Sequence, residues 1–170
     1  KEEAEEIAVN YFNEEYSVDA TVLRTEYRRM TYDKVYLNYI TVLIDNEEYQ
    51  LLLDDENKPL IDDYSISMFV KNLETNKLEE WKSKYGLDEY ASLEIDGRFE
   101  YAGYKEAKRR VAFYIKTQEI PKAEDADKLW DLLCELRENG IEYFGIGVVS
   151  PGFLEAKVEL GHSRYMLGLI

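Results

Sequence analysis

The chain of 170 residues is poor in cysteine, in glycine over its first half, and in long apolar runs. Its single cysteine, Cys134, cannot form an internal disulfide and cannot by itself build a thiolate metal site. No apolar run approaches the roughly 20 residues that a membrane-spanning helix requires. The first residues, KEEAEEIA, contain neither an initiator methionine nor a charged-then-apolar leader, so we expect a trimmed fragment of a longer protein.

Cations are scarce as well. The 21 Lys and Arg residues stand against 36 Asp and Glu residues, which gives a net charge of -15 at pH 7. Because each phosphate contact requires a cation, this balance excludes ordinary nucleic-acid binding. It also opposes anionic membrane surfaces, so we expect membrane contact only through a lipid anchor removed from the fragment. The hydrophobic fraction of 45% supplies a core and excludes disorder as the main state.

The first half of the sequence predicts one helix followed by a meander of strands. Apolar residues recur between residues 4 and 12 at the spacing of an amphipathic helix, and β-rich segments follow at residues 18–29, 34–44 and 47–53. Asp45-Asn46 is a tight-turn signal between the last two. The pattern favours a fourth strand over residues 60–68.

The middle of the chain predicts a second helix and a hairpin. Asn76 and Glu79 have the spacing of a capping box, and Gly86 supplies the helix stop. Asp96-Gly97 is typical of a type I′ hairpin turn. Residues 108–117 alternate like a strand, although a helix is the open alternative.

A third helix is predicted after Pro121, ending at Asn139-Gly140. We expect its apolar stripe, which includes Leu129, Trp130 and Leu133, to be largely buried against a sheet, and we expect Cys134 to be a core residue. Strands are predicted beyond it at residues 141–149, 153–160 and 163–170.

The order of elements indicates an α+β fold made of repeated helix-plus-antiparallel-meander units, with the helices packed on antiparallel sheet. All nine glycines lie from Gly86 onward. We therefore expect an N-terminal α-β module over residues 1–85 and a C-terminal module over residues 86–170, with one continuous domain as the alternative.

This element order resembles tandem α-β-β-β modules such as the PepSY and β-lactamase-inhibitory-protein groups. More loosely, it is similar to the curled sheets of cystatin and NTF2-like domains in small Gram-positive lipoproteins. The resemblance covers most of the chain at the level of element order, and the disulfides of the inhibitory-protein group are absent. It implies a noncatalytic, extracytoplasmic binding or inhibitory module.

Residue patterns that carry chemistry are weak in this sequence. The only candidates for a nucleophile and base are Cys134 and the lone His162, for which a packing residue and a solvated turn are the favoured interpretations. The acidic runs at residues 54–57 and 62–63 lack the order of a calcium loop. Gly145 and Gly147 fall within a predicted strand, where they indicate a bulge or close packing. We therefore expect no catalytic residue, no metal and no cofactor.

Two basic islands interrupt the acidity, and local salt bridging is the favoured interpretation of both. The first is Arg28-Arg29, and the second comprises Lys105, Lys108, Arg109 and Arg110.

Tyrosine is the residue that points to a partner. The chain contains 15 tyrosines, and Tyr27 and Tyr32 flank a predicted turn beside Arg28 and Arg29. Tyrosine adds contact area at low rotamer entropy, which suits protein recognition, although its high β propensity explains the pattern equally well. These four residues are the predicted partner-binding residues.

The leading hypothesis is therefore an extracellular or cell-surface protein-interaction module. A cytoplasmic acidic inhibitor or immunity-type protein that binds a basic partner is the alternative. The oligomeric state stays open.

Overall fold

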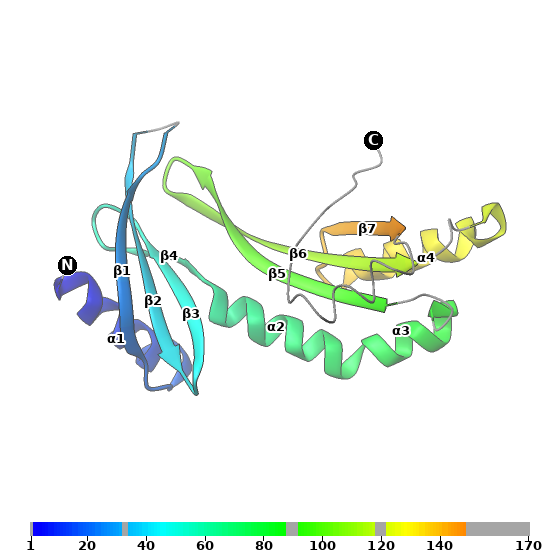
Figure 1. The fold of residues 1–170 in the computed structure, drawn as a ribbon, viewed down its shortest axis with the longest axis horizontal. Helices are drawn as coiled ribbons and strands as arrows, with labels where there is room; N and C mark the ends of the chain where they lie inside the picture. Colours follow the sequence, from blue (N-terminus) through cyan, green and yellow to red (C-terminus); the bar gives the residue numbers. More distant parts are fainter. Residues whose placement is uncertain (1, 32–33, 88–91, 118–121, 149–170) are drawn as a thin grey trace. The chain divides into compact units, whose positions relative to one another are not determined.

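The computed structural model describes residues 2–31, 34–87, 92–117 and 122–148, which form an α+β fold (Figure 1). The elements in chain order are α1 (Glu2–Tyr16), β1 (Thr21–Arg29), β2 (Tyr36–Ile44), β3 (Glu47–Leu53), β4 (Pro59–Asp62), α2 (Asp63–Asn76), α3 (Leu78–Tyr85), β5 (Ser92–Gly103), β6 (Glu106–Thr117), the 3-10 turn η2 (Ala123–Asp125), α4 (Ala126–Glu138) and β7 (Tyr143–Val148). In the part of the chain that the structure describes, no helix has the length and apolar character needed to cross a membrane.

The chain divides into two compact units that are each discontinuous in sequence. The first comprises residues 1–69 and 97–110, and the second comprises residues 70–96 and 111–170. The boundary expected at Tyr85–Gly86 therefore falls inside the second unit. Residues 97–110, which form the turn end of the β5–β6 hairpin, belong with the first unit.

The first unit contains an antiparallel sheet of four strands in the order β1-β2-β3-β4. Asp45 and Asn46 have φ values of 50° and 67° and join β2 to β3, which confirms the predicted turn. A register shift between Val22 and Arg24 marks a bulge in the edge strand β1. Such bulges discourage accidental pairing at an open edge.

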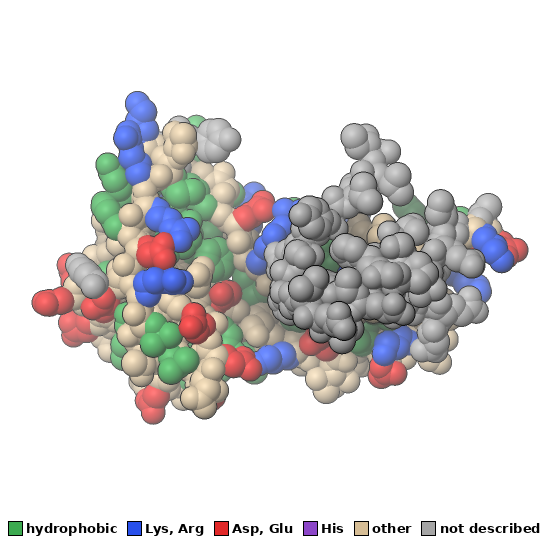
Figure 2. All heavy atoms as spheres, viewed as in Figure 1, with side chains coloured by type: hydrophobic (Ala, Val, Ile, Leu, Met, Phe, Trp, Pro, Cys, Tyr) green, Lys and Arg blue, Asp and Glu red, His purple; other side chains and the backbone are tan. Residues whose placement is uncertain are grey.

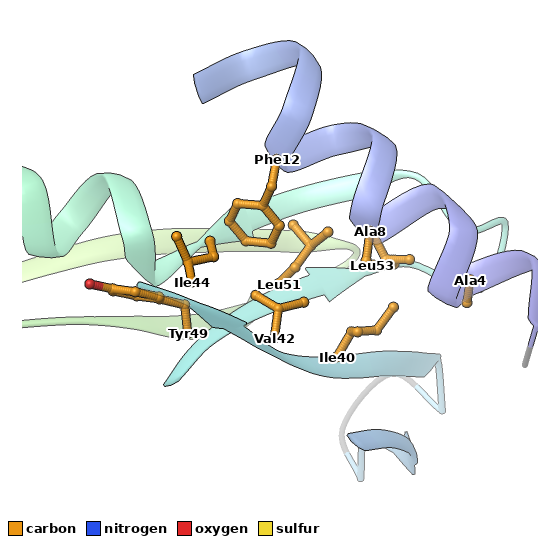
Figure 3. Close-up of a cluster of buried hydrophobic side chains, with 9 residues drawn as sticks. All are labelled: Ala4, Ala8, Phe12, Ile40, Val42, Ile44, Tyr49, Leu51 and Leu53. Carbon is orange, nitrogen blue, oxygen red and sulfur yellow. The ribbon is translucent and has the colours of Figure 1, made fainter. Parts of the chain in front are cut away.

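Helix α1 covers one face of this sheet (Figure 3). Ala4, Ala8 and Phe12 recur every fourth residue and so share one side of the helix. They pack on alternate residues of the strands, which point to the same face. The complete set of core residues is Ala4, Ala8, Phe12, Ile40, Val42, Ile44, Tyr49, Leu51 and Leu53. The structure thus confirms the predicted helix and the three strands predicted at residues 18–29, 34–44 and 47–53.

Asp62 ties α1 to the start of α2. Its Oδ2 accepts hydrogen bonds from Tyr11 Oη and Tyr16 Oη, both at 2.8 Å, and its Oδ1 accepts one from the backbone N–H of Ser65 at 2.7 Å. The carboxylate is only 3% exposed. Burial, together with the hydrogen bonds to Tyr16 and Asp62, raises the pKa of Tyr11.

The same contact explains why the predicted strand over residues 60–68 is wrong beyond its first residues. Strand β4 ends at Asp62 and helix α2 begins at Asp63. The Asp62 carboxylate accepts a hydrogen bond from the backbone N–H of Ser65, three residues later in the chain. It thereby satisfies one of the N–H groups that the start of a helix leaves unpaired. Alternation of apolar residues alone does not reveal that capping.

The other sheet has the strand order β5-β6-β7, and within the second unit β6 pairs with β7 in parallel from Ala112↔Tyr143 to Thr117↔Val148. The expectation of purely antiparallel sheet is therefore wrong for this pair. Helix α4 lies between β6 and β7 in the sequence. A crossover of that length returns the chain to its starting end, which allows parallel pairing.

Two local predictions in the middle of the chain are also wrong. Strand β5 continues through Asp96-Gly97, and the hairpin turns instead at Gly103, Tyr104 and Lys105, all with positive φ. The predicted capping box fails because the residue before α3 is Lys77, which makes no side-chain cap.

Other boundaries in the same region are as predicted. Gly86 ends α3 in the left-handed conformation with φ 65°. Strand β6 settles the open alternative at residues 108–117 in favour of a strand. Helix α4 ends at Asn139-Gly140, where Gly140 has φ 80°.

The two tryptophans of the second unit have opposite environments. Trp81 on α3 is fully buried and packs edge-on against Phe113 at 5.9 Å between ring centroids. Its Nε1 donates a hydrogen bond of 3.1 Å to Glu135 on α4. Trp130 on α4 is 65% exposed and Cys134 is also exposed, so the predictions that they are buried are wrong.

The face of α4 that is buried differs from the predicted stripe. Leu132 and Leu136 are buried, whereas Leu129 and Leu133 are only partly buried. Helix α4 has apolar residues on more than one face, so the spacing of these residues alone does not identify the face that is buried.

Glu135 links α3 to α4 through a set of hydrogen bonds. Lys84 Nζ donates to its Oε2 at 2.6 Å, and Tyr85 Oη and Trp81 Nε1 also donate to the carboxylate. The hydrogen bonds from Lys84, Tyr85 and Trp81 lower the pKa of Glu135 to about 2. The carboxylate therefore stays charged well into the acid range.

We expect Asp62→Ala to lower the free energy of unfolding by about 3 kcal/mol or more, because two tyrosine hydroxyls lose a charged acceptor and α2 loses its cap. Urea denaturation measures the loss. Asp19→Ala is the matched control, since Asp19 is exposed, and it should change stability by less than about 0.5 kcal/mol. Equal effects of the two substitutions would show that the Asp62 contacts do not stabilise the unit.

Trp81→Ala should cost about 3–5 kcal/mol, because it empties a fully buried site, whereas Trp130→Ala should change stability by no more than about 0.5 kcal/mol. Thermal or chemical unfolding of both variants tests the contrast within one unit. A large loss on Trp130→Ala alone would reverse the assignment of the buried face.

Candidate functional site

The candidate site lies at the end of the β1–β2 hairpin, where Tyr27 stacks on Tyr36. The ring centroids are 4.9 Å apart and the planes differ by 11°. In the strand register Tyr27 pairs with Asn38 and Arg29 pairs with Tyr36, so the two rings are diagonal neighbours on one face. Tyr27 is 62% exposed and Tyr36 is 39% exposed. The stack is therefore accessible and yet held in place.

Arginines flank the aromatic rings on both faces of the hairpin. The Arg29 guanidinium lies 6.0 Å from the Tyr36 ring centroid, and the Arg28 guanidinium lies 4.6 Å from that of Tyr39. Because successive residues of a strand point to opposite faces, the two contacts occupy opposite sides of the sheet. Arginine over a tyrosine ring is a cation–π contact.

Glu26 neutralises part of this charge. It forms an ion pair with Arg28, and its Oε1 lies 3.0 Å from Arg24 Nε. The hydrogen bond from Arg28, supported by the charges of Arg28 and Arg24, lowers the pKa of Glu26. Arg29 makes no ion pair within the described residues. Its guanidinium is therefore available to a partner at this end of the hairpin.

The structure places two of the four predicted partner-binding residues, Tyr27 and Arg29, on one face of the hairpin, and a third, Arg28, on the opposite face. Tyr27, Arg28 and Arg29 lie at the end of β1, and Tyr32 lies outside the described residues. Sequence reasoning missed Tyr36 and Tyr39, whose positions in β2 opposite β1 follow from the hairpin register. Figure 2 shows Lys, Arg and hydrophobic side chains gathered at this end of the hairpin.

Two of the four cations of the second basic island, Lys105 and Arg110, form the predicted ion pairs within the first unit. Lys105 Nζ lies 2.6 Å from Asp55 Oδ1, and Arg110 Nη1 lies 3.1 Å from Glu100 Oε2. The guanidinium of Arg109 stacks over Phe69 at 4.2 Å. Within the described residues, Lys108 and Arg109 form no ion pair, so the prediction of local salt bridging is correct for only half of the island.

The acidic loop at residues 54–57 is organised by its own backbone. Asp54 Oδ1 accepts the amides of Glu56 at 2.9 Å and Lys58 at 2.8 Å. Among the residues that the structure describes, no group of three His, Cys, Asp or Glu side chains is placed to hold a metal ion. His162 lies outside the described residues, so its predicted role stays a prediction.

The glycines of the GIG sequence lie in β7. A Cβ atom on Gly145 would come within 2.8 Å of the Tyr114 ring, whereas one on Gly147 would meet nothing within 4 Å. The predicted close packing is therefore confirmed at Gly145.

The first unit also contains a cavity of ≈ 340 Å³. Asp63, at the start of α2, contributes a carboxylate whose Oδ1 accepts the backbone N–H of Gln50 at 2.6 Å. Burial, reinforced by the charge of Asp62, raises the pKa of Asp63 to about 6.

Comparisons with known proteins add little to this geometry. No protein-family model matches the chain, and no curated protein matches it significantly. Among solved structures, the chain is similar to the crystal structure of a DUF5037 family protein from Ruminococcus gnavus ATCC 29149, with a TM-score of 0.45 and 14% identity. The similarity covers 92% of this chain and 79% of the other. At this level it carries no functional argument.

We expect Asp63→Asn to remove a pH dependence of stability. Because the pKa of Asp63 in the folded protein lies above its ordinary value of 3.8, the folded state binds the proton more tightly than the unfolded state does. The contribution of Asp63 to the free energy of unfolding therefore falls as the pH rises from about 4 to about 6.

Urea unfolding across this pH interval measures the effect. Asp63→Asn should gain stability relative to the parent chain as the pH rises, and the two should converge in acid. A constant difference between Asp63→Asn and the parent chain would contradict the raised pKa.

Proposed function

We propose that this protein is a noncatalytic protein-interaction module that binds its partner through the end of the β1–β2 hairpin and works outside the cytoplasm. The observation that carries the proposal is the exposed Tyr27–Tyr36 stack with Arg29 beside it. We call the surface formed by Tyr27, Arg29 and Tyr36 the hairpin surface.

The hairpin surface has the composition of an interaction hot spot. Tyrosine and arginine are enriched among residues that dominate protein–protein affinity. Each tyrosine has few rotatable bonds, and stacking already restricts Tyr27 before a partner arrives. Less conformational entropy is therefore lost on binding, which favours affinity for the same contact area.

The partner that fits this surface offers an apolar or aromatic patch with a carboxylate close to Arg29. The contact acts at short range, because the net charge of -15 does not attract an acidic protein from a distance. The hairpin surface should therefore control dissociation more than association.

Site-specific photo-crosslinking identifies the partner. A benzoylphenylalanine at position 27 should capture one protein in cells of the source organism, and the adduct should decrease on Arg29→Glu. Position 104 is the matched control, since Tyr104 belongs to the same unit and is 87% exposed at another hairpin turn. Equal capture at both positions, or none at position 27, would overturn the proposal.

Binding kinetics with the captured partner then test the mechanism. Tyr27→Ala should raise the dissociation rate by about tenfold or more, which is typical of an interface anchor, and Tyr104→Ala should leave it unchanged. The association rate should depend weakly on salt.

The alternative function is a cytoplasmic acidic inhibitor that attracts a basic partner by its net charge of -15. It requires an association rate that falls steeply with salt, with Tyr27→Ala having no effect. The gene also distinguishes the two locations. A leader with a lipobox cysteine upstream of Lys1 supports the proposed location, and a methionine start close to Lys1 supports the alternative.

A further inference from the structure

The cavity of the first unit lies on the sheet face opposite α1. Tyr39 and Gln50 line it, and they alternate along their strands with Ile40 and Leu51, which belong to the core beneath α1. Residues 97–101 of β5 supply the rest of the wall together with Met30 and Asp63. All of these residues belong to the first unit.

Two opposite charges line this cavity without ion-pair partners. Asp63 Oδ1 accepts the Gln50 amide, and the carboxylate forms no ion pair within the described residues. Arg98 makes no ion pair in the same part of the chain. The third charged residue of the lining, Glu100, is already paired with Arg110.

Aromatic side chains provide the apolar part of the wall. Tyr39, Phe99 and Tyr101 line the cavity beside the charged residues. Small-molecule sites commonly combine such apolar walls with a few polar groups that fix the orientation of the ligand. A volume of ≈ 340 Å³ lies within the range of such sites.

We propose that this cavity binds a small zwitterion of the amino-acid type, with its ammonium group at Asp63, its carboxylate at Arg98 and its side chain against the aromatic wall. A simple amine would leave the arginine without a counter-charge in the cavity, and a simple carboxylate would face Asp63. A zwitterion satisfies both groups, because each of its charges meets the opposite one. The site does not use the hairpin surface, so it is a second binding function.

Amide NMR spectra of the full chain test the proposal. Each standard L-amino acid is added at about 10 mM, a concentration that populates even a weak millimolar complex. At least one should shift the signals of residues 97–101. Its decarboxylated and deaminated analogues should bind about tenfold more weakly, because each lacks one charged hydrogen bond.

Substitutions test whether Asp63 and Arg98 bind the two charged groups of the ligand. Asp63→Asn and Arg98→Gln should each lower the affinity for the amino acid by about tenfold. Asp19→Asn and Arg109→Gln serve as controls and should leave that affinity unchanged. Asp63→Asn keeps an oxygen acceptor for the Gln50 amide, and spectra without ligand verify the fold. The proposal is overturned if no amino acid shifts these signals, if an analogue binds as well, or if both cavity variants bind normally.

Discussion

The buried carboxylate of Asp62 is the interaction on which the first unit depends. It receives the hydroxyls of Tyr11 and Tyr16 from α1 and the amide of Ser65 from α2, while its backbone ends β4. A buried charge is tolerable only when its oxygens are well supplied with donors, and here three donors surround it. The contact thus fixes where the sheet stops, where α2 starts, and how the carboxyl-terminal half of α1 is held.

The two faces of the sheet in the first unit differ in what lies against them. One set of alternate residues forms the core with α1, and on the opposite face Tyr39 and Gln50 line the cavity while Leu37 and Leu52 are buried. At the end of the hairpin the strands also carry the exposed Tyr27 and Tyr36, with Arg29 beside them. The net charge of -15 therefore does not describe the end of the hairpin, where Arg29 lies beside the ring of Tyr36.

Part of the candidate site could be predicted from the sequence, and the residues that could not be predicted share a physical reason. Tyr27, Arg28 and Arg29 stand out in the sequence as an aromatic and basic run in an acidic chain. Their stacking partners Tyr36 and Tyr39 follow only from the pairing of β1 with β2. The cavity was not predictable, because it unites Asp63 with Arg98, which are far apart in sequence and belong to no common motif.

The sequence by itself determined the α+β class, the helix α1, the strands β1 to β3, the turn at Asp45-Asn46 and the stop at Gly86. These features depend on local periodicity and on positive φ, which neighbouring residues specify. Tertiary structure alone decided that α2 replaces a strand after Asp62, that β5 passes through Asp96-Gly97, that β7 runs parallel to β6, and that Trp81 is buried while Trp130 is exposed. Each of these outcomes depends on a partner distant in the chain, such as the tyrosines that meet Asp62 or the glutamate that meets Trp81, and such partners leave no trace in local spacing.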